Sequence, residues 1–200
     1  MKRIHVLAVA ALASGLQGCN TFYAEAEQPQ VCLTLPTQSF TIPGGGGIVA
    51  PPGGFTASYS SPVDLGLSDV LPDFIMSGPS SDRIVHFLSF DATVSGAPGA
   101  NLDILSTLQV QALGAPGSTP VTLAQYVKGT RTGVRSISLE SLAPGTNLAD
   151  FLASGGLTVQ VSGTVSVPGG QAVPAVWSAQ VSSCLYAKIH KTFQQLIDGK

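Results

Sequence analysis

The side chains of this chain that could serve acid–base catalysis are few and widely spaced. Apart from His5 near the N-terminus, the histidines are His86 and His190. His86 stands inside an apolar run, which favours a buried core position, whereas His190 is expected to be exposed. The sequence contains no Gly-x-Ser-x-Gly turn of the kind that presents a hydrolase nucleophile. We therefore predict no catalytic residues and no enzymatic activity.

The carboxylates follow no spacing that is typical of a site. Calcium loops alternate Asp and Asn, and glycoside hydrolases bring two acids together. The central part of the chain holds Asp64, Asp69, Asp73, Asp82, Asp91 and Asp103. We expect these acids in solvated turns and caps. A hydrolase would instead need two of them, or His86, to converge in a cleft with shifted pKa values.

The first eighteen residues have the pattern of a cleavable export signal. Lys2 and Arg3 precede an apolar stretch over residues 4–16, which is shorter than the roughly 20 residues of a membrane-spanning helix. We predict that residues 1–18 are removed. The formal net charge then moves from -2 to about −4, without the basic cluster that nucleic-acid binding requires.

The residues around the expected cleavage point resemble the lipobox of bacterial lipoproteins. Leu16 occupies position −3, Gly18 position −1 and Cys19 the first mature position, whereas Gln17 replaces the usual small or aliphatic residue. The resemblance covers about a tenth of the chain. It implies that Cys19 carries a thioether-linked diacylglycerol, often with a further acyl group such as palmitate. Asn20, where an Asp would be associated with inner-membrane retention, favours the outer membrane.

Two or three acyl chains would anchor the protein to a membrane for its working life. Residues 20–30 are polar and are predicted to form a flexible tether between the lipid at Cys19 and a single domain over residues 31–200.

The two remaining cysteines, Cys32 and Cys184, lie near opposite ends of this domain. An even pair in an exported chain indicates a disulfide, which would join the first strand to the last. Closing a loop of roughly 150 residues contributes about 5 kcal/mol as an upper figure. Two buried free thiols are the alternative. Neither cysteine has a second Cys or a His at zinc-ligand spacing, so no metal site and no cofactor are predicted.

Composition and periodicity favour an all-β domain. Charged residues make up only 10% of the chain, and 23 Gly and 14 Pro punctuate it. Segments 31–42, 55–71, 84–94, 102–112, 157–167 and 175–188 read as strands, several of them with alternating apolar residues. We predict a β-sandwich, with an immunoglobulin-like arrangement as one candidate. Gly163, on the apolar side of its strand, indicates a bulge or a close neighbour.

Three short segments have helical features. Residues 122–129 and 147–155 each begin with a capping residue and end at a glycine, although residues 122–127 fit a strand equally well. Ile189, Phe193, Leu196 and Ile197 lie at helical spacing, which predicts a C-terminal amphipathic helix. The glycine-rich run 44–54 is expected to be a plain loop, because no Lys and Ser or Thr follow its glycines.

The function that these features favour is a lipid-anchored cell-envelope protein with a non-enzymatic binding or structural role. Its partners would be the membrane, through the anchor, and another envelope protein. The alternative is a carrier of an apolar ligand between the sheets, in a cavity lined by residues such as Leu88, Phe90 and Val161. A hydrolase is the least favoured of the three.

Overall fold

The computed structural model describes residues 23–65, 67, 82–95, 101–113, 119–152 and 157–192. Within these ranges the regular elements are β-strands and one short 3-10 helix, η3 (Ala149–Leu152). The predicted all-β class is therefore confirmed. Cys19, Asp69, Asp73 and the predicted helical residues after Thr192 lie outside the described ranges.

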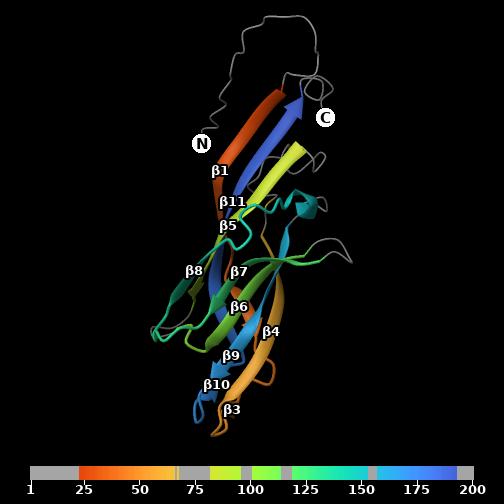
Figure 1. Ribbon diagram of the computed structural model, residues 1–200. Helices are drawn as coiled ribbons and strands as arrows, with labels where there is room; N and C mark the ends of the chain where they lie inside the picture. Colours follow the sequence, from red (N-terminus) through yellow and green to blue (C-terminus); the bar gives the residue numbers. More distant parts are fainter. Residues whose placement is uncertain are drawn as a thin grey trace, which may run out of the picture.

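Two antiparallel sheets form the body of the fold, as Figure 1 shows. The long sheet has the order β1-β11-β5-β8. β2 also pairs with β11, on the same edge as β1 and beyond the end of β1. Its strands are β1 (Tyr23–Thr34), β2 (Gln38–Thr41), β5 (Arg83–Val94), β8 (Ser136–Glu140) and β11 (Val176–Thr192). The short sheet has the order β4-β9-β6-β7. Its strands are β4 (Phe55–Asp64), β6 (Leu105–Ala112), β7 (Val121–Val127) and β9 (Thr158–Val167). A separate two-stranded ladder joins β3 (Ile48–Val49) to β10 (Ala172–Val173).

The strand order is that of a jelly roll. Because β1 and β2 both pair with β11, they act as one strand interrupted at Pro36. Counted along the chain, the first, eighth, third and sixth main strands then form the long sheet, and the second, seventh, fourth and fifth form the short sheet. The predicted β-sandwich is confirmed, but its strand order is not the immunoglobulin one. The physical reason is that almost every connection crosses between the sheets, and only β6 and β7 form a hairpin within one sheet.

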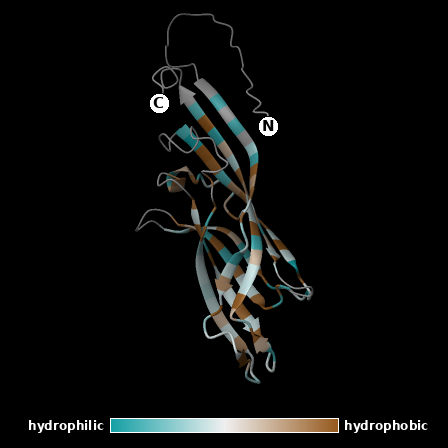
Figure 2. Ribbon diagram, turned by 180° about the vertical axis from the view of Figure 1, so that it is seen from behind, coloured by the Kyte–Doolittle hydropathy of each residue, from teal (hydrophilic) through white to brown (hydrophobic). Residues whose placement is uncertain are grey.

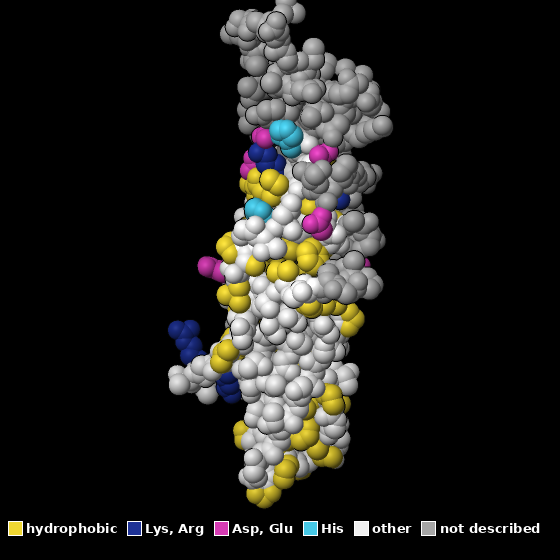
Figure 3. All heavy atoms as spheres, turned by 45° about the vertical axis from the view of Figure 1, so that its right-hand side comes forward, with side chains coloured by type: hydrophobic (Ala, Val, Ile, Leu, Met, Phe, Trp, Pro, Cys, Tyr) yellow, Lys and Arg dark blue, Asp and Glu magenta, His cyan; other side chains and the backbone are white. Residues whose placement is uncertain are grey.

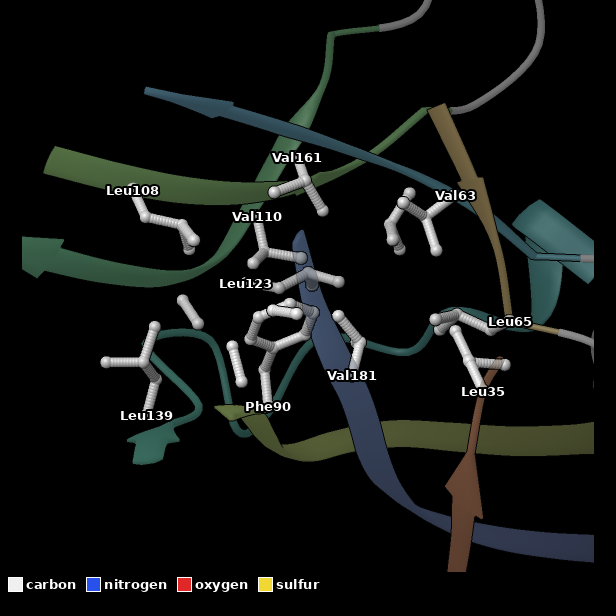
Figure 4. Packing of buried hydrophobic residues seen from close by; sticks show 14 of the residues in the cluster. Leu35, Val63, Leu65, Phe90, Leu108, Val110, Leu123, Leu139, Val161 and Val181 are labelled. Carbon is white, nitrogen blue, oxygen red and sulfur yellow. The ribbon is translucent and has the colours of Figure 1, made fainter. Parts of the chain in front are cut away.

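The core lies between the inner faces of the two sheets. Figure 4 shows Phe90 and Val181 of the long sheet facing Leu108, Val110 and Val161 of the short sheet. All five side chains are essentially buried. Hydrophilic and hydrophobic residues alternate along the strands in Figure 2, as expected where each sheet buries one face.

β11 has the longest uninterrupted alternation. Trp177, Ala179, Val181 and Leu185 are buried on its inner face, while Tyr186 lies on the outer face, as the sequence predicts. Gly163 in β9 has the predicted close neighbour, because a Cβ there would lie 2.1 Å from the carbonyl oxygen of Thr107 in β6.

The alternation of β5 is broken by a bulge. Phe87 faces Leu185 and Ser89 faces Cys184, so Leu88 is an extra residue without its own partner. The buried positions therefore change from Val85 and Phe87 to Phe90 and Ala92. His86, predicted to lie in the core, lies instead on the outer face of the long sheet.

β1 begins at Tyr23, so residues 23–30 are not the flexible tether that their polarity predicts. They pair with β11, with Glu25 opposite His190 and Glu27 opposite Lys188. β11 in turn continues to Thr192, and Ile189 is a buried strand residue rather than the start of a helix. Each strand satisfies the backbone hydrogen bonds of the other, which outweighs their local preferences.

The two capped segments with similar sequences fold differently. Residues 122–127 belong to β7, which pairs with β6. Asn147 caps η3, because its Oδ1 accepts hydrogen bonds from the backbone amides of Ala149 (3.0 Å) and Val85 (2.9 Å). Its Nδ2 donates to the Arg83 carbonyl at 2.8 Å. Asn147 thereby closes the edge of β5 beyond the end of β8.

The domain is elongated along β11. Figure 1 places the start of β1 and the end of β11 at one end of the molecule, and β3 and β10 at the other. At roughly 3.3 Å per residue, β11 alone spans about 55 Å. We call these two ends the N-terminal end and the tip.

Candidate functional site on the outer face of the long sheet

Polar side chains from three strands gather on the outer face of the long sheet near the N-terminal end. We call this group the outer-face cluster. Its members are Glu25 and Glu27 of β1, His86 of β5, and Tyr186, Lys188 and His190 of β11. Alternate residues of β11 point to the same face, which places its three members in one row between β1 and β5. Figure 3 shows histidine, acidic and basic side chains on this upper part of the surface.

Glu25 is the centre of the charged part of the cluster. Its Oε2 lies 2.8 Å from Lys188 Nζ, and its Oε1 lies 3.3 Å from His190 Nδ1. Hydrogen bonds from Lys188 and then His190 hold the pKa of Glu25 below its ordinary value. The same bond to Glu25 raises the pKa of Lys188. The three paired side chains remain partly exposed to solvent. We therefore expect the two ion pairs to hold these side chains in position on the sheet and to contribute little to the stability of the fold.

Tyr186 lies on β11, the strand that carries His190, and is paired with His86 of β5. Its ring lies 5.7 Å from the ring of His86, centroid to centroid, in a tilted arrangement. Partial burial, followed by the nearby charge and hydrogen bond of Glu27, raises the pKa of the Tyr186 hydroxyl. The cluster thus offers hydrogen-bond donors, acceptors and both signs of charge over a flat sheet surface.

Replacing Lys188 by methionine is expected to raise the pKa of Glu25 toward its ordinary value, because the largest contribution to the lowering is lost. Glu25 stabilises the fold at pH values above its unfolded pKa, and this contribution disappears as the pH falls through the lowered folded pKa. Carboxyl NMR titration of the wild type and Lys188→Met measures the change. Arg131→Met, which alters a loop away from β1, should leave the Glu25 titration where it is; equal titrations in all three proteins would contradict the assigned ion pair.

The predicted disulfide is confirmed. Cys32 and Cys184 are directly opposite each other on β1 and β11, with Cα atoms 4.1 Å apart and the sulfurs bonded. The bond lies on the outer face, next to the cluster along β11. Gln30 Nε2 donates a hydrogen bond to Cys32 Sγ at 3.3 Å.

The described aspartates are spread over the fold. Asp64 ends β4 in the short sheet, and Asp91 lies in β5 of the long sheet. Asp103 binds a turn: its Oδ2 accepts from Gly133 N at 2.7 Å and its Oδ1 from Val134 N at 3.1 Å, and these bonds lower its pKa. In the described part of the chain, His, Cys, Asp and Glu form no group of three or more able to hold a metal ion. No helix in that part is both long and apolar enough to cross a bilayer.

The three residues named for an apolar ligand cavity do not line one space. Phe90 and Val161 belong to the contacting core between the sheets, where they are 1% and 0% exposed. Leu88 is the bulged, half-buried residue of β5. These positions offer no support to the carrier alternative.

The sequence does not single out four members of the outer-face cluster, namely Glu25, Glu27, Tyr186 and Lys188. The two glutamates fell within the predicted tether. Their signal was the alternation in Tyr23-Ala-Glu-Ala-Glu27, in which the polar residues are two positions apart as in a strand with one wet face.

No family model and no curated protein matches the chain. Among solved structures it is similar to a chain of infectious bursal disease virus, Gt strain, with 14% identity and a TM-score of 0.29 over 92% of this chain. The chain covers 37% of that virus chain. It is also similar to desmodium yellow mottle tymovirus, with 11% identity and a TM-score of 0.31, covering 96% of this chain and 97% of that one. At this level the likeness carries no functional conclusion, and the jelly-roll assignment rests on the strand order.

Proposed function

We propose that this chain is a lipid-anchored cell-envelope protein with a non-enzymatic binding or structural role, attached to a membrane through Cys19. The observation that carries the proposal is the position of the lipobox-like residues Leu16 to Cys19, which end four residues before β1. Asn20 favours the outer membrane as the place of attachment.

The distance from Cys19 to the fold is short. Four residues span at most about 14 Å even when fully extended, so Tyr23 must lie within that distance of Cys19. An acylated Cys19 would therefore hold the N-terminal end of the long sheet close to the lipid headgroups. The outer-face cluster would lie beside the membrane, and the tip would point away from it.

The disulfide supports this role in two ways. Disulfides form in oxidising compartments such as the bacterial periplasm and the cell surface. In addition, β1 is an edge strand that pairs with β11 and with no other described strand, so a pull on Cys19 would break its hydrogen bonds one after another from Tyr23. The bond between Cys32 and Cys184 would stop this peeling at the twelve-residue strand's far end.

Replacing Cys19 by serine tests the anchor. We expect the variant to lose incorporation of labelled palmitate and to be extracted from membranes by alkaline carbonate, because serine offers no thiol for the thioether. Cell fractionation and metabolic labelling give the two readouts. Cys32→Ser/Cys184→Ser is the control, since it also removes cysteines but should stay acylated and membrane-bound. A Cys19→Ser protein that resists alkaline extraction as the wild type does, or an unlabelled wild type, would overturn the proposal.

A further inference from the structure

The tip of the domain carries no charged side chain. The sequence has no Asp, Glu, Lys, Arg or His at positions 28–63 or 151–187. These two stretches supply β2, β3, β9, β10 and all of β4 except its last residue, and β3 and β10 form the lowest end of the molecule in Figure 1. Figure 3 shows hydrophobic and uncharged surface at this end, while charges lie farther up.

The apex of the tip consists of two loops, residues 43–54 and 168–175, joined by the β3–β10 ladder. Several of their backbone amides, and that of the preceding Ile42, donate to carbonyls within the tip itself. The bonds are Ile42 N to Ala175 O (2.8 Å), Gly46 N to Val173 O (3.0 Å), Ala50 N to Gln171 O (2.8 Å), Gly54 N to Pro51 O (2.8 Å) and Gly170 N to Ala50 O (2.9 Å). These amides therefore need no hydrogen bond from water.

Glycines let the two loops touch. A Cβ on Gly45 would lie 2.3 Å from the carbonyl oxygen of Pro174, and one on Gly169 would lie 2.6 Å from that of Pro52. The low-complexity run that reads as a plain loop is thus one half of a closely packed pair. The two loops therefore form a rigid support for the side chains at the apex.

The large hydrophobic side chains exposed on this support are aliphatic, and the polar Gln171 is exposed beside them. Val49 is 65% exposed, Val176 46% and Ile48 41%. The aromatic residues of the tip, by contrast, are buried: Trp177 stacks on Phe40 with ring centroids 4.2 Å apart.

We propose that the tip inserts its aliphatic side chains into the surface layer of a phospholipid bilayer. An apolar medium excludes charges and unsatisfied backbone groups. The tip has no charged side chain, and several of its backbone amides are bonded internally. Protein interfaces take most of their binding energy from exposed Trp, Tyr and Arg. The tip exposes Ile and Val instead, which favours lipid over a protein partner.

The position of the tip has a further consequence if Cys19 is acylated, and this part of the inference rests on the proposed function. The tip and the start of β1 lie at opposite ends of the domain, about 55 Å apart along β11. A protein acylated at Cys19 would therefore present the tip to a second bilayer and bridge the two.

Vesicle binding by the full mature chain with Cys19→Ser tests the tip without the anchor. Neutral phosphatidylcholine vesicles are floated with the protein, and a second set contains lipids brominated on their acyl chains. Trp177, the sole tryptophan of the chain and a tip residue, reports contact with the bromines by quenching. We expect binding that persists when NaCl is raised to about 1 M, because no charge pairs are involved, together with quenching of Trp177.

Val49→Lys should weaken this binding roughly tenfold or more, since it puts a charge where an aliphatic side chain enters the lipid. Val127→Lys is a matched control, because Val127 is also 65% exposed but lies at the end of β7, away from the tip. Equal losses in both variants, or no binding by the parent protein, would overturn the proposal. Self-association of the parent that Val49→Lys abolishes, without vesicle binding, would overturn it in favour of a second copy.

The bridge is tested separately with the acylated protein reconstituted into vesicles. We expect these vesicles to cluster with protein-free vesicles, as measured by light scattering, and the Val49→Lys protein to cluster them far less. Binding of the Cys19→Ser protein without such clustering would reject the bridge and leave the tip contact standing.

Discussion

Replacing Cys32 and Cys184 together by alanine is expected to lower the free energy of unfolding by about 3–5 kcal/mol. The bond closes a loop between residues separated by 152 positions, so its loss frees most of the unfolded chain. Cys32 is exposed, and Cys184, although buried, lies on the outer face and outside the core cluster, so little core packing is lost with the sulfurs. Urea unfolding at neutral pH, followed by circular dichroism, measures the difference.

Reduction separates the bond from the side chains. Dithiothreitol should destabilise the wild type by a similar amount and leave the double-alanine variant unchanged. A reduced wild type that unfolds within about 1 kcal/mol of the oxidised protein would mean that strand pairing alone secures β1. The disulfide would then have no part in resisting a pull on the anchor.

Replacing Gly163 by alanine is expected to cost about 3 kcal/mol or more, because the added methyl group has no room between the strands. The new Cβ would lie 2.1 Å from the carbonyl oxygen of Thr107 and 2.7 Å from the Tyr59 hydroxyl. The first contact is with backbone, so a side-chain rotation cannot relieve it. β9 pairs with β4 on one side and β6 on the other, so a shift would disturb both ladders.

Gly129→Ala provides the matched control for this substitution. A Cβ at Gly129 would have no atom within 4 Å, so its effect should stay within about 0.5 kcal/mol. Thermal and urea unfolding of the two variants give the comparison. Similar stabilities for Gly163→Ala and Gly129→Ala would show that β6 and β9 are farther apart than described.

The strands that the sequence predicts best are those that bury one face without interruption. In β9 and β11 the apolar residues alternate along the whole strand, because each position meets either the core or water. β5 was assigned correctly as a strand, but His86 was given the wrong face. The bulge at Leu88 arises from pairing with β11, and a local pattern contains no information on the partner.

The candidate sites were harder to predict than the strands. Glu25 and Glu27 resemble tether residues until β11 is paired with them, and the glycines near the tip resemble a loop until residues 168–175 lie against it. Residues 122–127 and 147–152 have similar capping patterns but form a strand and a 3-10 helix. In each case the local structure depends on pairing with a segment that is distant in the sequence.

The sequence by itself determined the all-β class and the alternation of the main strands and indicated the pairing of the two domain cysteines, because these follow from side-chain period and composition. The tertiary structure decided the jelly-roll order, the face of His86, the strand at Glu25 and the uncharged tip. Those features depend on which distant strands share hydrogen bonds, and many strand orders bury the same alternating residues equally well.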